Sequence, residues 1–154
     1  MNSHILDVLL ASNKTELSVL EAMFDVEPYR SGEVIPLPGS GALDTLALLS
    51  KGNIEVKIPH GVGESIICMI YPADMIELNT FVAHTAHKAR LYAVGETNIL
   101  CMSKSKLESM SKSHPLVMYR VAQGIMHNYQ NILGRMGSRI AELSDYIYHT
   151  NSRI

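Results

Sequence analysis

The C-terminal part of the chain carries an unbroken series of apolar residues at alternating spacings of four and three. This is the heptad pattern of a helix that pairs lengthwise with a partner helix. The series spans about three and a half heptads, close to the length that indicates a coiled coil. It follows Pro115, which suits the first turn of a helix because its missing N–H costs nothing there. The positions are Ala122, Met126, Tyr129, Leu133, Met136, Ile140, Leu143 and Ile147.

Such a stripe is explained either by packing against the helix's own domain or by self-association. Its length favours self-association. Gly124, Gly134 and Gly137 each cost about 1 kcal/mol relative to alanine within a helix, so we expect this helix to need a partner. We therefore predict a homodimer formed through residues 113–154, a dimerisation helix that belongs to the same structural domain as residues 1–112.

The composition restricts the class of protein. A chain of 154 residues with 47% hydrophobic and 18% charged residues is long enough for one globular domain with an appended helix. The net charge is −2 and no basic block is present, which argues against direct binding of nucleic acid. Cys68 and Cys101 lie in apolar runs and are expected to be buried thiols. The apolar run at residues 5–10 is too short and too acidic for a signal peptide or a membrane span, so we expect a cytoplasmic protein without membrane contact.

Three segments differ in their hydrophobic pattern. Residues 1–27 have helical spacing, interrupted at Ser12-Asn13. From Tyr29 to Met102 the pattern changes to short β-type runs separated by turn residues, which predicts an all-β roll, sandwich or barrel. From Ser103 onward the pattern is helical again. The expected strands are 34–35, 45–49, 54–58, 65–70, 91–94 and 99–102, and the expected breaks are 38–41, 51–53, 59–63 and 94–96.

The order of helix, β-roll and long helix resembles that of the cyclic nucleotide-binding domain. Residues 29–35 resemble the entry to the family's first strand, where a glycine precedes Glu-Val-Ile. Residues 46–56 resemble its hairpin with a fixed glycine, and residues 71–76 resemble the Pro-Gly-Asp opening of its phosphate-binding cassette, with Ala73 in place of glycine. The chain looks most like the N-terminal sensor half of bacterial catabolite-activator and fumarate-nitrate-type regulators. The resemblance implies a mainly β fold with flanking helices, namely a β-roll of the double-stranded β-helix or jelly-roll type.

The resemblance also implies a ligand inside the roll. In the cassette, a Gly-Glu pair and a later Arg-Ser pair bind the ribose and the cyclic phosphate, and here these positions hold Glu77-Leu78 and His87-Lys88. The expected arginine is therefore replaced by a histidine that is mostly neutral at neutral pH. Strand alternation places His87 inward with Ala89, Leu91 and Ala93, and it places Lys88, Arg90 and Tyr92 outward. The candidate ligand-binding residues are Asp74, Ile76, Glu77, Leu78, His87 and Lys88, with Asn128, Asn131 and Arg135 on the C-terminal helix.

These features imply a non-catalytic regulatory domain with a degenerate site for cyclic AMP or cyclic GMP and an unidentified effector. No cofactor is assigned. A haem or metal sensor on the same roll is an alternative suggested by His84 and His87, but two histidines without a Cys or carboxylate set form a weak signature. The sequence offers no recognisable nucleophile and base pair, so we expect no enzyme. In the regulators that the chain resembles, a DNA-binding module follows the long helix, whereas this chain ends at Ile154. It is therefore either a sensor acting through protein partners or the effector domain of a truncated transcription regulator.

Overall fold

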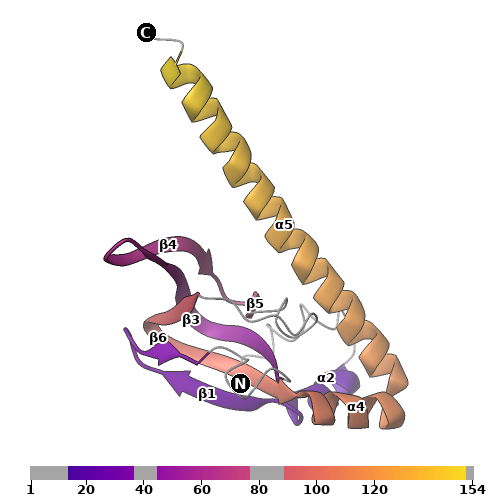
Figure 1. The fold of residues 1–154 in the computed structure, drawn as a ribbon. Helices are drawn as coiled ribbons and strands as arrows, with labels where there is room; N and C mark the ends of the chain where they lie inside the picture. Colours follow the sequence, from indigo (N-terminus) through magenta and orange to yellow (C-terminus); the bar gives the residue numbers. More distant parts are fainter. Residues whose placement is uncertain (1–13, 37–44, 77–88, 152–154) are drawn as a thin grey trace.

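The computed structural model describes residues 14–36, 45–76 and 89–151 (Figure 1). A mainly antiparallel sheet forms the body of the domain, and helices gather at one end of it (Figure 1). The elements are α2 (Lys14–Glu21), β1 (Asp25–Tyr29), β2 (Val34–Ile35), β3 (Thr45–His60), β4 (Gly63–Ile70), β5 (Met75–Ile76), β6 (Arg90–Ser103), α4 (Lys104–Ser113) and α5 (Pro115–Asn151).

The sheet has six strands, and every described pair is antiparallel. Its main path is β1-β6-β3-β4, with β2 added to β6 and β5 added to β3. The long strands β3 and β6 pair along most of their length and form the centre of the roll. The mainly β fold with a long C-terminal helix that the sequence predicts is confirmed.

Both faces of the central strands are buried. Because successive side chains of a strand point to opposite faces, the strand residues divide between two core clusters. One core cluster lies between the sheet and the helices, and the other lies in the interior of the roll. The strand residues of the first are Leu46, Leu48, Met75, Leu100 and Met102. Those of the second are Ile35, Ala47, Leu49, Ile54, Val56, Ile76, Leu91, Ala93 and Ile99. The short strand β5 therefore contributes Met75 to the helix side and Ile76 to the roll side.

Two predicted breaks are irregularities within continuous strands. Gly52 (φ +81°) and Gly95 (φ +74°) have left-handed backbones inside β3 and β6, where the pairing register shifts between Leu49 and Asn53. The buried Thr97 fills this region, and its Oγ1 lies 3.4 Å from the Asn53 carbonyl oxygen. The prediction of breaks at 51–53 and 94–96 was wrong in this respect, because each strand bends through its glycine and continues against the other. The predicted break at 59–63 does contain the turn between β3 and β4.

The helical pattern of the first 27 residues ends earlier than the sequence predicts. The described helix α2 ends at Glu21, and Asp25–Tyr29 form strand β1. These residues pair with Thr97–Cys101 of β6, so sheet pairing outweighs their helical spacing. Leu20 and Phe24 still lie in the core between sheet and helices.

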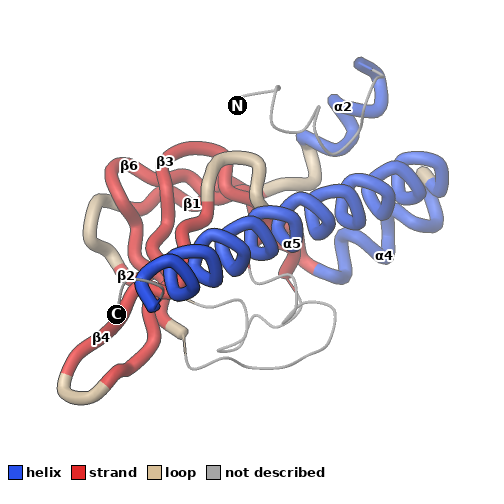
Figure 2. The backbone as a smooth tube through the Cα atoms, turned by 90° about the horizontal axis from the view of Figure 1, so that it is seen from above, coloured by secondary structure: helices blue, strands red, loops and turns tan. Residues whose placement is uncertain are grey.

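The helices that follow β6 begin as the sequence predicts. The Ser103 side chain caps α4 by accepting a hydrogen bond from the Lys106 N–H at 3.3 Å. Pro115 is the first residue of α5, which crosses the roll and extends past it (Figures 1 and 2). Within the described residues, no helix has the length and apolar character needed to cross a membrane.

Candidate functional site

The turn before β5 is built around Asp74, which is buried. The Asp74 N–H donates to the Tyr71 carbonyl at 2.9 Å, and the Tyr71 N–H donates to Asp74 Oδ2 at 3.0 Å. The turn also pairs with β3, since the Ala73 N–H donates to the Leu49 carbonyl and the Leu49 N–H donates to the Asp74 carbonyl. Ala73 has φ +74°, a conformation that favours glycine. This positive φ angle explains why the family's cassette, which residues 71–76 resemble, has glycine at the position of Ala73.

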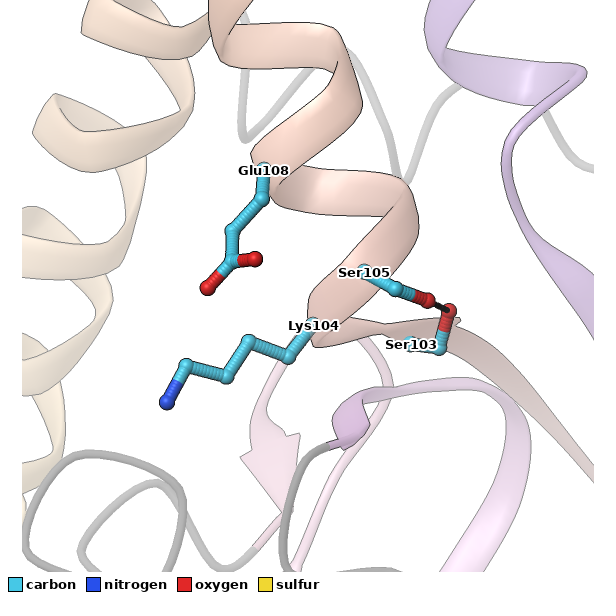
Figure 3. Close-up of a pocket in the computed structure, with 4 residues that line it drawn as sticks. All are labelled: Ser103, Lys104, Ser105 and Glu108. Atoms are coloured by element: carbon cyan, nitrogen blue, oxygen red, sulfur yellow. Dashed lines mark hydrogen bonds between the residues drawn. The ribbon is translucent and has the colours of Figure 1, made fainter.

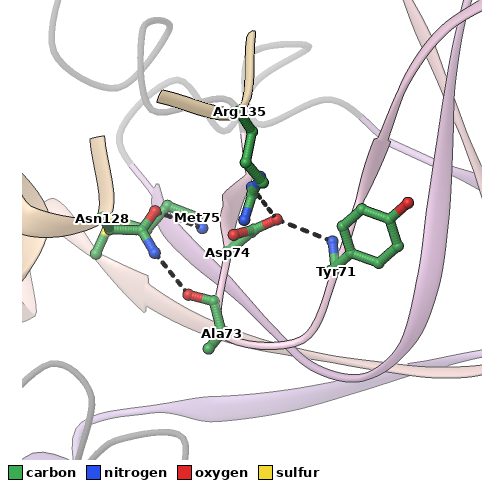
Figure 4. A network of polar contacts seen from close by, with 6 residues as sticks. All are labelled: Tyr71, Ala73, Asp74, Met75, Asn128 and Arg135. Carbon is green, nitrogen blue, oxygen red and sulfur yellow. Dashed lines mark hydrogen bonds and ion pairs between the residues drawn. The ribbon is translucent and has the colours of Figure 1, made fainter. Parts of the chain in front are cut away.

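Asn128 joins α5 to this turn. Its buried side chain donates from Nδ2 to the Ala73 carbonyl at 2.7 Å and accepts the Met75 N–H on Oδ1 at 3.1 Å (Figure 4). The side-chain amide thus satisfies the backbone groups on either side of Asp74, as a neighbouring strand would. Together with β3, it fixes the position of the turn.

Arg135 makes a second connection two helical turns further along α5. Its Nη2 lies 2.6 Å from Asp74 Oδ2, and its guanidinium carbon lies 5.9 Å from the centre of the Tyr71 ring (Figure 4). The Asp74 side chain is 7% exposed, whereas the Arg135 side chain is 48% exposed. The ion pair therefore joins a buried carboxylate to a cation that solvent reaches.

The two faces of α5 have different environments. The face toward the roll carries Val117, Val121 and Asn128, which are buried. The residues of the predicted heptad series, from Ala122 to Ile147, are exposed. The explanation that this stripe packs within its own domain was therefore wrong. Tyr119, 61% exposed, continues the same spacing by one position, a member that the sequence analysis missed.

The structure brings together three of the predicted ligand-binding residues, namely Asp74, Asn128 and Arg135. Ile76 is buried in the roll interior, where its side chain belongs to the core. Asn131 is exposed on α5 and does not join this group. Glu77, Leu78, His84, His87 and Lys88 lie outside the described residues.

The predicted alternation along the start of β6 is confirmed for the residues that the structure describes. Ala89, Leu91 and Ala93 are buried in the roll interior. Arg90 and Tyr92 face outward, where both bind Glu64 of β4, at 2.9 Å and 2.8 Å. Arg90 therefore does not supply a cation to the interior of the roll.

Other polar groups show less promise as a site. A hollow of about 340 Å³ at the start of α4 is lined by Ser103, Lys104, Ser105 and Glu108 (Figure 3). The two serine hydroxyls bind each other at 3.0 Å, and Ser103 already serves as the cap of α4. Cys68 and Cys101 are reduced cysteines and are partly rather than fully buried. Across residues 14–36, 45–76 and 89–151, no group of three or more His, Cys, Asp or Glu side chains could hold a metal ion.

The fold is that of cyclic nucleotide-binding β-roll domains, as the resemblance in the sequence implies. The structure is similar to a cyclic nucleotide-binding domain from Methylobacillus flagellatus, with a TM-score of 0.76 and 16% identity over 90% of this chain and 81% of that one. It is also similar to the N-terminal domain of a transcriptional regulator from Streptomyces coelicolor, with a TM-score of 0.66 and 16% identity over 86% and 95% of the two chains.

A third similar structure is the catabolite activator protein of Thermus thermophilus, with a TM-score of 0.60 and 20% identity. The match covers 89% of this chain and 60% of the activator. At these identities the likeness establishes the fold. No protein-family model matches the sequence, and comparison with curated proteins gives no match.

Proposed function

We propose that this chain is a non-catalytic regulatory domain that binds a small effector inside the β-roll and transmits its presence through a pair of α5 helices. The observation that carries the proposal is the double role of α5. One face of this helix is bonded to the turn before β5 through Asn128 and Arg135, and another presents an exposed apolar stripe. A change in the roll therefore reaches the surface through which two chains would associate.

The exposure of the stripe supports homodimerisation. Leu133, Met136, Ile140 and Leu143 are between 50% and 64% exposed in the single chain. Full burial of such a side chain contributes about 1.5–3 kcal/mol, so two helices can together offset the cost of association. Large exposed apolar surfaces on a folded chain mark interaction sites.

Sedimentation at micromolar concentration tests this proposal. We expect a dimer for the unmodified chain and a monomer for Leu133→Glu, because the substitution places an unpaired charge at the centre of the stripe. Ser138→Glu introduces the same charge on the opposite side of the helix and should remain dimeric. A monomeric unmodified chain would refute the proposed association.

A second candidate function is the effector domain of a DNA-binding transcription regulator. It is supported by the similarity to the N-terminal domain of the Streptomyces coelicolor regulator and by the 60% coverage of the Thermus thermophilus activator. In that case, the α5 pair would act on a DNA-binding module. Reading the genomic sequence that follows the codon of Ile154 decides between the two, because a stop codon there supports a stand-alone sensor and an open frame supports the regulator.

The nature of the effector belongs to the same proposal. Asp74 and Ile76 begin the cassette, and His87 replaces its arginine, so we propose that cyclic AMP and cyclic GMP bind weakly and that another small molecule is the natural effector. The haem or metal alternative depends on His84 and His87. A visible absorption spectrum of the purified protein tests it, since bound haem would give an intense band.

A further inference from the structure

We propose that Arg135 is the residue that binds the anionic group of the effector, and that Asp74 occupies it when no effector is present. An effector that carries a phosphate group would then replace the Asp74 carboxylate as the partner of Arg135. This inference rests on the proposed regulatory function and specifies the chemistry of its site.

The first argument is the position of Arg135. It lies on the face of α5 that is bonded to the roll, and it contacts the turn that leads into β5. Ile76, two positions after Asp74, belongs to the same cassette and points into the roll interior. Arg90 is the first residue of β6 and follows the cassette closely in the sequence, but it is paired with Glu64 on the outer surface. Among the described residues of these elements, Arg135 is therefore the cation placed to serve the cassette.

The second argument is the incomplete use of the guanidinium group. Arginine has five N–H donors in a planar arrangement that matches the oxygen atoms of phosphate or carboxylate. Among the described residues, Arg135 donates a hydrogen bond from Nη2 to one oxygen of Asp74. Since its side chain is 48% exposed, an anion from solvent can reach it while Asp74 remains buried.

The third argument is that the exchange leaves the turn intact. The Tyr71 N–H continues to bind Asp74 Oδ2, and Asn128 continues to bind the Ala73 carbonyl and the Met75 N–H. Of the two side chains that bond α5 to the turn before β5, Asn128 and Arg135, the second lies further along the helix, in a segment whose residues 133–149 are exposed. Binding of an anion at Arg135 therefore removes the ion pair with Asp74 without disturbing the hydrogen bonds of Asn128.

Isothermal titration of the full chain with cyclic AMP and with inorganic pyrophosphate tests the inference. Asp74→Asn keeps an oxygen that accepts the Tyr71 N–H but removes the negative charge, so we expect both anions to bind at least about tenfold more tightly. Arg135→Gln should weaken binding of both by at least about tenfold. Arg139→Gln removes an exposed cation one turn further along α5 and should change neither affinity. Adenosine, which lacks the charge, should bind all variants equally.

Two results would overturn the inference. The first is binding of cyclic AMP that Arg135→Gln leaves unchanged, an outcome that leaves the proposed effector site in the roll intact. The second is failure of Asp74→Asn to bind either anion at millimolar concentration while its circular dichroism spectrum and thermal transition show a folded chain. A titration that follows the Arg135 Nε–H resonance supplies an independent measurement, because its shift must saturate with pyrophosphate if this group binds the anion. Failure of the proposed function would appear separately, as a monomeric chain in sedimentation.

Discussion

Gly52 stands where the structure has no room for a side chain. A Cβ atom at this position would lie 2.6 Å from the Glu96 carbonyl oxygen and 2.5 Å from Thr97 Oγ1. Gly95 has a similar left-handed backbone, but a Cβ atom there would meet no atom within 4 Å. Alanine substitutions at the two glycines therefore separate the free-energy cost of the left-handed backbone from the cost of steric overlap.

We expect Gly95→Ala to lower the free energy of unfolding by about 1–2 kcal/mol, the cost of a left-handed alanine. For Gly52→Ala we expect a loss of about 2–5 kcal/mol, since overlap with a backbone carbonyl adds to the same conformational cost. Urea unfolding at one protein concentration measures both. Equal losses in the two variants would show that the region around Thr97 can move to admit a side chain.

Burial of the Cys101 thiol raises its pKa from 9.0 to about 12, with a further contribution from the nearby carboxylates of Glu27 and Asp25. The folded state therefore disfavours the thiolate. The stability that this group contributes is fully present below pH 9 and is lost as the pH rises toward about 12. In a Cys68→Ser background, we expect alkylation by iodoacetamide to stay slow up to about pH 11 and to become fast in urea, because the thiolate is the reactive form. A rate that rises with a midpoint near pH 9 in the folded protein would contradict this prediction.

At the scale of elements, the attachment of α5 depends on one amide side chain. We expect Asn128→Ala to lower the free energy of unfolding by about 2–4 kcal/mol, because it leaves the buried Ala73 carbonyl and Met75 N–H without a partner. Asn131 lies three residues further along the same helix and is exposed, so Asn131→Ala should change stability by less than about 0.5 kcal/mol. Urea unfolding of the two variants, compared at equal concentration, is the measurement. A loss below about 0.5 kcal/mol for Asn128→Ala as well would show that its hydrogen bonds to the turn contribute little to stability.

The elements also show which parts of the structure a sequence can predict. Apolar periodicity is a local property, so the heptad stripe, the start of α5 at Pro115 and the alternation along β6 could be predicted from the residues alone. The sequence also marks the glycines at 52 and 95 as irregular positions. Whether a chain reverses or bends at such a glycine depends on the strand beside it, and this pairing is absent from the local pattern.

The candidate site was predictable to a similar degree. Asn128 and Arg135 could be selected as polar residues outside the apolar stripe of α5, and Asp74 by its position in the cassette. The bonds of Asn128 and Arg135 to the turn before β5 depend on how α5 packs against the rest of the domain, which is set by tertiary contacts such as those of Val117 and Val121. A sequence pattern therefore identified the participants but could not distinguish Asn128 from Asn131.

At the scale of the whole molecule, charge determines one prediction. With a net charge of −2, the chain should show no salt-dependent binding of duplex DNA at micromolar concentration. A mobility-shift titration with random duplex at two salt concentrations measures this. A shift that weakens as salt increases would indicate a basic surface that the sequence does not predict.

A second prediction concerns cyclic nucleotides and pH. Losing the cassette arginine and glutamate should weaken binding by roughly two to four powers of ten, so we expect cyclic AMP and cyclic GMP to bind in the high micromolar range or more weakly at about pH 7.5. Toward about pH 6 a protonated imidazole at His87 would add a second positive charge to that of Arg135 in attracting the phosphate, so binding should strengthen. Isothermal titration at both pH values is the measurement, with His87→Arg as the variant expected to restore affinity at the higher pH. Submicromolar binding by the unmodified chain at pH 7.5 would show that the cassette is aligned incorrectly.

The contact between Arg135 and Asp74 also determines how far a small motion can travel. From Arg135 to Asn151, α5 continues for 16 further residues, or about 24 Å at the usual rise of an α-helix. In the proposed regulatory domain, this segment would act as a lever that pivots at the turn before β5. A tilt of about 10° at the pivot would displace the far end by about 4 Å. A small tilt where Arg135 meets Asp74 would thus become a displacement at the far end of about three quarters of the spacing between successive turns of the helix.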